Sequence, residues 1–278
     1  AKRLPSILPP LTLSESLETT QIHSIAGKLS AGKGLISQRP FRSPHHTISQ
    51  VALVGGGVDP MPGEISLAHN GILFLDELPE FDKAALETLR QPLEDGVVTI
   101  TRASGSLTLP SRFMLVCAMN PCRCGWFGHP SGRCTCTDSQ VQSYLRRISG
   151  PLLDRIDMHV EVPSVEYEAM RRKEQPETSQ QVRSRVNAAR QVQQRRYEGT
   201  GVTCNAYMTP AMIGQYCQLD TAGEKLMQGA FDRLGLTGRS HDRILRMART
   251  IADLEGEEQI LPTHLAEAIQ YRSSAMLK

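Results

Sequence analysis

Two runs of apolar residues, each followed by polar side chains, indicate buried strands of a parallel sheet. Residues 71–75 read Gly-Ile-Leu-Phe-Leu and lead directly into Asp76 and Glu77. Residues 113–119 are a second apolar run, which ends at Asn120. Strands without a polar face are typical of the centre of parallel sheets. Open α/β folds place their ligands at the carboxyl edge of such a sheet, so the three polar side chains are candidates for one site.

Asp76 and Glu77 match the Walker B pattern of ATP-hydrolysing P-loop proteins. In that motif the first carboxylate helps to hold Mg²⁺ and the second orients the attacking water. Asn120 can hydrogen-bond the attacking water or the γ-phosphate, as a sensor of nucleotide state. The alternatives are a core strand that ends in a charged turn, and an ordinary Asn-Pro turn after the second strand.

The segment before these strands is expected to be a helix followed by a loop. Residues 14–29 have the apolar spacing of a helix. The glycine run at 55–57 could cradle a phosphate, but no Lys-Ser or Lys-Thr follows it, so we expect a loop or hairpin tip. His45 and His46 are adjacent in a turn. Their side chains are expected to diverge, which argues against a shared metal ion.

A helix and a β-hairpin are predicted between the two apolar strands. The helix covers 82–91 and is ended or kinked by Pro92. Residues 97–112 alternate apolar and polar positions around a central turn, which indicates a hairpin. Arg102 and Arg112 give the hairpin positive charge, and they are candidates for contact with DNA phosphates.

Four of the seven cysteines lie within residues 122–136, in two Cys-x-Cys pairs. Four thiolates that converge from two short turns suit a tetrahedral Zn²⁺ ion, which then has no open position and acts structurally. The expected ligands are Cys122, Cys124, Cys134 and Cys136. Three alternatives remain: His129 in place of one cysteine, an iron–sulfur cluster, and four thiols without a metal.

Arginines in and after the cysteine loop are further candidates for phosphate contact. Arg123 lies in the loop together with Trp126, an arrangement that suits stacking and phosphate binding. Arg155 precedes an expected third strand at 158–162. There its guanidinium could reach the nucleotide of a neighbouring subunit. An ion pair within the chain, with Asp154 or Asp157, is the alternative.

Beyond residue 163 the chain becomes highly charged and only helical patterns follow. Helices are expected at 179–197, 209–219, 222–234, 238–254 and 262–274. The sequence therefore predicts an α/β domain at 1–163 and an all-α domain at 164–278. Arg239 begins one of these helices and could reach a phosphate, although most arginines on amphipathic helices are solvated.

Composition narrows the class of protein. The chain has 278 residues, of which 40% are hydrophobic and 22% charged, as in a soluble globular protein. It has no apolar run of membrane-spanning length and no signal-peptide pattern, so a cytoplasmic protein is expected, without a membrane partner. A net charge of +2 neither favours nor excludes nucleic acid. An odd number of crowded cysteines favours metal over disulfides in a reducing compartment.

Four long motifs resemble the ComM/YifB family, the magnesium-chelatase-like AAA+ ATPases of bacteria. The motifs lie at 63–81, 118–121, 149–157 and 248–254. The resemblance covers nearly the whole chain and implies an AAA+ core, a helical lid domain and assembly into a ring, with a hexamer expected. Asn120 matches the first sensor, Arg155 the arginine finger and Arg239 the second sensor. Residues 41–60 match an insert in the second AAA+ helix, and 97–112 match the hairpin that faces the ring pore.

The resemblance also implies an activity. In the ComM type this is ATP-driven branch migration of DNA during natural transformation, whereas the chelatase relatives drive magnesium insertion into a porphyrin. The family's Walker A loop, Gly-x-x-x-x-Gly-Lys-Ser/Thr, does not occur in this chain, which starts just after its expected place. We therefore expect these residues alone to bind Mg-ATP poorly and to hydrolyse none. The alternatives to a DNA motor are a chelatase-like ATPase that remodels a protein or metal complex, and a zinc-stabilised binding module without enzymatic activity.

Overall fold

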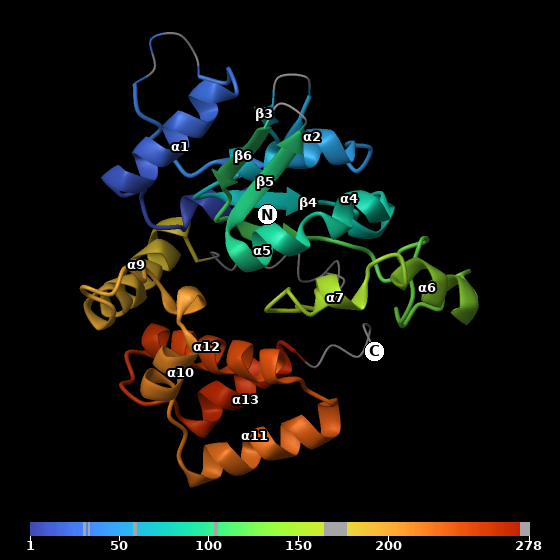
Figure 1. Cartoon of the computed structure of the whole chain (residues 1–278). Helices are drawn as coiled ribbons and strands as arrows, with labels where there is room; N and C mark the ends of the chain where they lie inside the picture. The colour runs from blue at the N-terminus through green and yellow to red at the C-terminus, as the bar shows by residue number, and fades with distance from the viewer. Residues whose placement is uncertain (30–31, 33, 58–59, 103–104, 164–176, 273–278) are drawn as a thin grey trace. The chain divides into compact units, whose positions relative to one another are not determined.

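The chain forms two compact units, Ala1–Ile156 and Asp157–Lys278 (Figure 1). The structure is a computed structural model that describes residues 1–29, 32, 34–57, 60–102, 105–163 and 177–272, and the side chains of 101–102 are outside the described part. The first unit ends seven residues before the boundary expected at 163.

A three-stranded parallel sheet is the framework of the first unit. Its order is β1 (Phe41–Arg42), β4 (Ile72–Leu75) and β7 (Met114–Cys117). Strand β4 lies in the middle, and its residues Ile72, Leu73 and Leu75 have no exposed surface. Burial on both faces explains why this strand is apolar throughout. The predicted parallel α/β core is confirmed.

Short helices surround the sheet. They are η1 (Leu4–Ser6), α1 (Leu13–Ile25), α2 (Gln50–Val54), α3 (Glu64–Leu67), η2 (Leu78–Glu80), α4 (Lys83–Glu87), α5 (Arg90–Asp95), α6 (Asp138–Leu145) and α7 (Gly150–Leu153). The helix predicted at 82–91 is divided into α4 and α5, and Pro92 lies inside α5. Proline has no amide hydrogen to donate to the carbonyl four residues earlier, that of Thr88, and this is where α4 ends.

Two hairpins complete the first unit. Strands β5 (Val97–Arg102) and β6 (Gly105–Pro110) pair antiparallel, which confirms the predicted hairpin. Strands β2 (Gly55–Gly56) and β3 (Met61–Pro62) form a smaller one, so two residues of the glycine run form a hairpin strand and not the loop or hairpin tip that was expected. Gly55 has a φ of +112°, and a Cβ atom there would lie 2.5 Å from the carbonyl oxygen of Met61. A larger residue would therefore break this hairpin.

The second unit is helical wherever the structure assigns regular secondary structure. Its elements are α9 (Ser179–Arg196), η3 (Asn205–Tyr207), α10 (Pro210–Tyr216), α11 (Thr221–Leu234), α12 (Gly238–Glu255) and α13 (Pro262–Gln270). Helix α12 buries Ile244, Ala248 and Ile251 at helical spacing in the core of the unit. Among the described helices, none combines the length and the apolarity that crossing a membrane requires.

The third strand expected at 158–162 is not formed. The structure assigns no strand to this described segment, and Val160 and Val162 are 62% and 84% exposed. The amide of His159 donates instead to the carbonyl of Tyr271, in the second unit (2.7 Å). The alternation of apolar and polar residues is typical of a strand. A strand also needs a neighbouring strand to pair its backbone hydrogen bonds, and alternation does not provide one.

Candidate functional site

The polar residues that follow β4 and β7 emerge at one edge of the sheet. The two strands are parallel, and their register pairs Leu75 with Cys117, so Asp76 comes level with the residue after Cys117. The amide of Leu78 donates to the carbonyl of Ala118 (3.0 Å) and ties the two strand ends together. Asp76, Glu77 and Asn120 are all exposed. The carboxylates are therefore accessible at this edge rather than packed inside the core.

The backbone of Glu77 is in the left-handed region, with φ 54° and ψ 46°. Among the described residues, Asn70 is the only other non-glycine residue with a positive φ. This conformation costs a residue with a Cβ atom about 1 kcal/mol, and such strain is concentrated at functional sites. The amide of Glu77 donates to Oδ1 of Asp76 (3.0 Å), and its carbonyl accepts from Glu80 (2.7 Å).

A histidine to which the sequence analysis gave no role contacts Glu77. Nδ1 of His46 lies 3.1 Å from Oε2 of Glu77. The rings of His45 and His46 do not diverge as expected, because their centroids are only 4.1 Å apart. The turn that carries both histidines follows β1, the parallel neighbour of β4, so it lies at the same sheet edge as Glu77. That pairing is visible only in the structure, so no local sequence signal pointed to His46.

Arg155, which follows α7, lies elsewhere on the first unit. Its guanidinium forms an ion pair with Glu94 of α5 and donates to the carbonyl of Pro151 (2.8 Å). An ion pair within the chain was the alternative interpretation, and Glu94, which the sequence analysis did not name, is such a partner. Arg155 lines an open cavity of about 760 Å³ between α2, α4, α5 and β5, and Asp76 and Glu77 are not part of that lining.

Arg239 belongs to the second unit, where it is the exposed second residue of α12. Two arginines further along the same helix have contacts within that unit. Arg243 pairs with Asp157, and Nη2 of Arg246 donates to the carbonyl of Met208 (2.7 Å).

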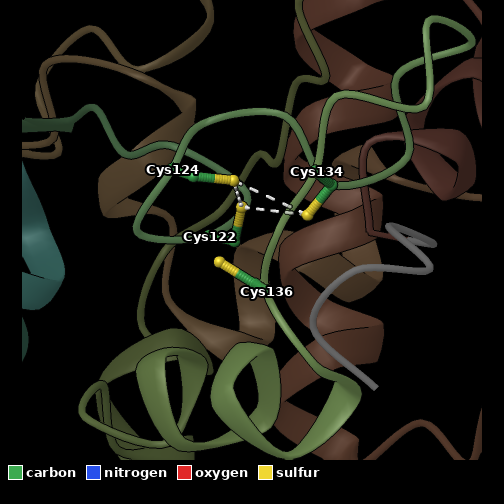
Figure 2. A group of neighbouring side chains, drawn as sticks. All are labelled: Cys122, Cys124, Cys134 and Cys136. Atoms are coloured by element: carbon green, nitrogen blue, oxygen red, sulfur yellow. Dashed lines mark hydrogen bonds between the residues drawn. The ribbon is translucent and has the colours of Figure 1, made fainter.

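The four cysteines of the loop 122–136 bring their sulfur atoms together (Figure 2). All four Sγ atoms lie within 4.8 Å of one another. Sγ of Cys122 lies 3.3 Å from that of Cys124 and 3.9 Å from that of Cys134, and the Cys124–Cys134 distance is 3.6 Å. A tetrahedron with metal–sulfur bonds of about 2.3 Å has edges of about 3.8 Å. The thiol group therefore has the size that one metal ion requires, and all seven cysteines are free of disulfides.

Backbone amides direct hydrogen bonds at these sulfur atoms. The amides of Trp126 and Thr135 lower the pKa of Cys124 to about 6. The amide of Cys136 also lowers the pKa of Cys134, but burial and the neighbouring thiols outweigh it and raise that pKa to about 11. Amide donors to sulfur stabilise thiolate ligands. The group of converging ligand atoms consists of the four cysteines and does not include His129, whose Nδ1 atom faces the hydroxyl and amide of Ser131 (2.7 and 3.0 Å).

An aromatic and basic group lies on the same loop. The guanidinium of Arg133 lies 5.2 Å from the centre of the Trp126 ring, and His129 meets that ring edge-on at 5.0 Å. Arg123 is exposed nearby in the sequence. On the hairpin, Arg112 is exposed at the base beside Gly96, whereas the side chain of Arg102 is outside the described part. Arg112 and Arg123 belong to different segments of the chain, and each is a separate candidate for phosphate contact.

A parallel sheet with paired carboxylates at the end of its central strand, followed by a helical unit, is the architecture of the AAA+ class of ATPases. The family profile for magnesium chelatase, subunit ChlI, matches residues 1–170, and the profile for its C-terminal part matches residues 176–272. The chain belongs to this magnesium chelatase family, in its ComM/YifB group. The family resemblance drawn from the sequence is confirmed.

Individual relatives match between 75% and 100% of this chain. The competence protein ComM of Haemophilus influenzae is 44% identical over 279 residues, which cover 100% of this chain and 53% of that protein. The uncharacterized protein YifB of Escherichia coli is 43% identical, over 98% of this chain and 53% of its own length. The magnesium-chelatase subunit ChlI of Mesostigma viride is 25% identical, over 75% of this chain and 51% of its length. The chain spans about half the length of the curated relatives it matches.

Proposed function

We propose that this chain is part of an ATP-hydrolysing AAA+ motor that acts on DNA. The observation that carries the proposal is the position of Asp76, Glu77 and Asn120, which follow the parallel strands β4 and β7 and are exposed at one sheet edge. Asp76 would hold Mg²⁺, because an exposed carboxylate is a ligand that this ion prefers. When bound, Mg²⁺ supplies positive charge to the phosphate oxygens.

In this proposal each residue has one task. Glu77 accepts a hydrogen bond from the attacking water and so orients it toward the γ-phosphate. The Asn120 amide donates to the water or to the γ-phosphate, and thereby distinguishes the state of the nucleotide. The exposed Arg239 of the second unit contacts a phosphate as the second sensor.

Arg155 is proposed to act on the nucleotide of a neighbouring subunit. Support comes from its place in a cavity whose lining excludes Asp76 and Glu77. An arginine that serves a different copy requires an assembly in which one surface of each subunit meets a different surface of the next. Such contacts close into rings, and we propose a hexamer.

Hydrolysis of ATP by the full-length protein tests the motor proposal. Glu77→Gln and Asp76→Asn should each lower kcat by about 100-fold or more, because they remove groups that act in the transition state. Glu198→Gln, an exposed carboxylate of the second unit, is the matched control and should leave kcat unchanged. Full activity of the Glu77→Gln protein would refute the assigned role.

DNA is the proposed substrate because exposed arginines accompany the candidate pore hairpin and the cysteine loop. A relative 44% identical is named a competence protein. DNA should stimulate ATP hydrolysis by the full-length protein. Arg112→Gln and Arg123→Gln should each weaken DNA binding and reduce the slope of its salt dependence by about one. Arg185→Gln, on the exposed face of α9, should do neither.

Remodelling of a protein or metal complex is the second candidate function. The observation that favours it is the similarity to a magnesium-chelatase subunit. ATP hydrolysis that is indifferent to DNA of any form would favour this candidate over the DNA motor. A full-length protein that binds zinc but hydrolyses no ATP would instead be a zinc-stabilised binding module.

We also propose that Cys122, Cys124, Cys134 and Cys136 hold one structural Zn²⁺ ion. The size of the sulfur tetrahedron and the amide donors to sulfur support it. Elemental analysis of this chain should find about one zinc per molecule. Cys134→Ser should lose it, whereas Cys204→Ser, a cysteine outside the loop, should retain it. Iron in place of zinc, with visible absorption, would identify an iron–sulfur cluster instead.

A further inference from the structure

His46 and Glu77 contact each other across the edge of the sheet, and the roles assigned above do not use this contact. Nδ1 of His46 and Oε2 of Glu77 are 3.1 Å apart. The two residues follow the parallel neighbours β1 and β4, so strand pairing brings them together. A carboxylate can only accept hydrogen bonds, so the imidazole is the donor through Nδ1.

We propose that His46 is a positioning residue for the carboxylate of Glu77. Its hydrogen bond to Oε2 fixes the plane of the carboxylate, which then presents its second oxygen to the attacking water. The inference rests on the proposed ATP hydrolysis and adds to it a residue that does not itself touch the nucleotide.

His46 is the better fixed of the two partners. Its side chain is 29% exposed, against 57% for Glu77. Its ring lies against that of His45 and meets the ring of Phe81 edge-on, with centroids 6.4 Å apart. Phe81 is 2% exposed and belongs to the core of the first unit. An imidazole placed against a core side chain can orient a flexible glutamate, and the reverse is not expected.

Hydrogen bonds between His45 and the residues after His46 hold the turn in place. The carbonyl of His45 accepts from the amide of Ile48 (3.0 Å), and Nδ1 of His45 faces the hydroxyl of Thr47 (2.9 Å). Ile48 packs against the core cluster. The histidine is therefore placed by the fold before any ligand arrives.

The backbone of Glu77 is fixed as well, so its side-chain torsions are the remaining freedom. Two hydrogen bonds hold its left-handed backbone. The amide of Glu77 donates to Oδ1 of Asp76, and the amide of Leu78 donates to the carbonyl of Ala118. A glutamate has three side-chain torsions, and one hydrogen bond to a fixed donor selects among their combinations. Orientation of a reacting group contributes strongly to rate, and a misplacement of about 1 Å can cost about 100-fold.

The test is steady-state ATP hydrolysis by the full-length protein with substitutions at His46. His46→Ala should lower kcat by about 10- to 100-fold and change the KM for ATP by less than about twofold, because contacts to the nucleotide remain. His46→Asn, whose amide can donate to Oε2, should recover part of the loss. Glu198→Gln, an exposed carboxylate of the second unit, is the control and should retain kcat within about twofold.

Comparison with Glu77→Gln separates positioning from a general loss of structure. If His46 acts through Glu77, adding His46→Ala to Glu77→Gln should not lower the residual single-turnover rate further. An equal further loss in that background, an effect on KM alone, or an unchanged kcat in His46→Ala would each overturn the inference. A wild-type protein without ATP hydrolysis, or a fully active Glu77→Gln protein, would overturn the proposed function together with it. The two failures are therefore distinguishable.

Discussion

The guanidinium of Arg155 is bound by the carboxylate of Glu94. This pair lies in a cavity lined by α2, α4, α5 and β5 residues, whereas Asp76 and Glu77 follow the sheet edge. An arginine finger that contacts the nucleotide of its own chain would be expected beside Asp76 and Glu77. The arrangement therefore favours a role on a neighbouring subunit.

Mixed rings test this directly in the full-length protein. Glu77→Gln subunits and Arg155→Ala subunits should each be nearly inactive alone, because loss of an arginine finger costs about 1,000-fold or more. Mixed in equal amounts, they should recover about a quarter of wild-type ATP hydrolysis, since a quarter of the interfaces then pair an intact Glu77 with an intact Arg155. Recovery should require subunit exchange. No recovery in rings shown to be mixed would place Arg155 on its own chain's nucleotide.

The buried carboxylate of Asp253 should be essential for stability of the second unit. It accepts from Arg196 at 2.5 and 2.8 Å, from Arg249 at 3.1 Å and from Asn205 at 2.8 Å, and its side chain has no exposed surface. Asp253→Ala leaves two arginines without their shared anion and should lower the free energy of unfolding by about 3–5 kcal/mol. Urea unfolding followed by circular dichroism measures this. Asp232→Ala, an exposed position on α11, should change it by less than about 0.5 kcal/mol.

Stability of the first unit should fall as the pH drops below about 6.5, the pKa of an ordinary histidine. Burial lowers the pKa of His69, and its Nδ1 accepts from the Arg112 amide (3.0 Å) while Nε2 faces Glu18 (3.1 Å). Protonation at Nδ1 would break the bond to Arg112. Because the folded pKa is the lower one, the unfolded state binds the proton first and stability is lost on acidification.

His69→Gln should make the stability of the first unit less dependent on pH between 6.5 and 5. Each pH unit is worth at most about 1.4 kcal/mol for one histidine. Unfolding midpoints at pH 7.5 and 5.5 provide the measurement, with His45→Gln, at an exposed turn, as the control. An unchanged pH slope in His69→Gln would contradict the assignment. The burial of His23, which also lowers its pKa, contributes in the same direction and should remain.

The single tryptophan reports on the cysteine loop. Trp126 is the only tryptophan of the chain, and Arg133 and His129 pack against its ring. Removal of the proposed metal ion by a chelator should shift the fluorescence of Trp126 to longer wavelength, because the loop would lose its cross-link and the ring would meet more water. The helical circular dichroism signal should persist. Cys134→Ser should show the shifted spectrum from the start, and a chelator response identical to wild type would exclude Cys134 as a ligand.

The sequence predicts best where burial leaves a simple pattern. Strand β4 is buried on both faces, whereas β7 is apolar but only partly buried, with Met114 exposed. The candidate residues Asp76, Glu77 and Asn120 follow from where those strands end. The cysteine pairs could be grouped because their spacing is local. His46 could not be found in this way, because β1 is only two residues long and its pairing with β4 is not a local property of the chain. The false strand at 158–162 had the correct alternation and lacked a neighbour to pair with.

The left-handed conformation of Glu77 lowers the stability of the fold, whereas its side chain is proposed to be needed for ATP hydrolysis. Glycine adopts this region without steric cost, so Glu77→Gly should raise the melting temperature while abolishing ATP turnover in the full-length protein. Differential scanning calorimetry beside a turnover assay would show both changes. The left-handed backbone at Glu77 therefore lowers the thermal stability of the fold, and the proposed role of its carboxylate in hydrolysis is the compensating gain.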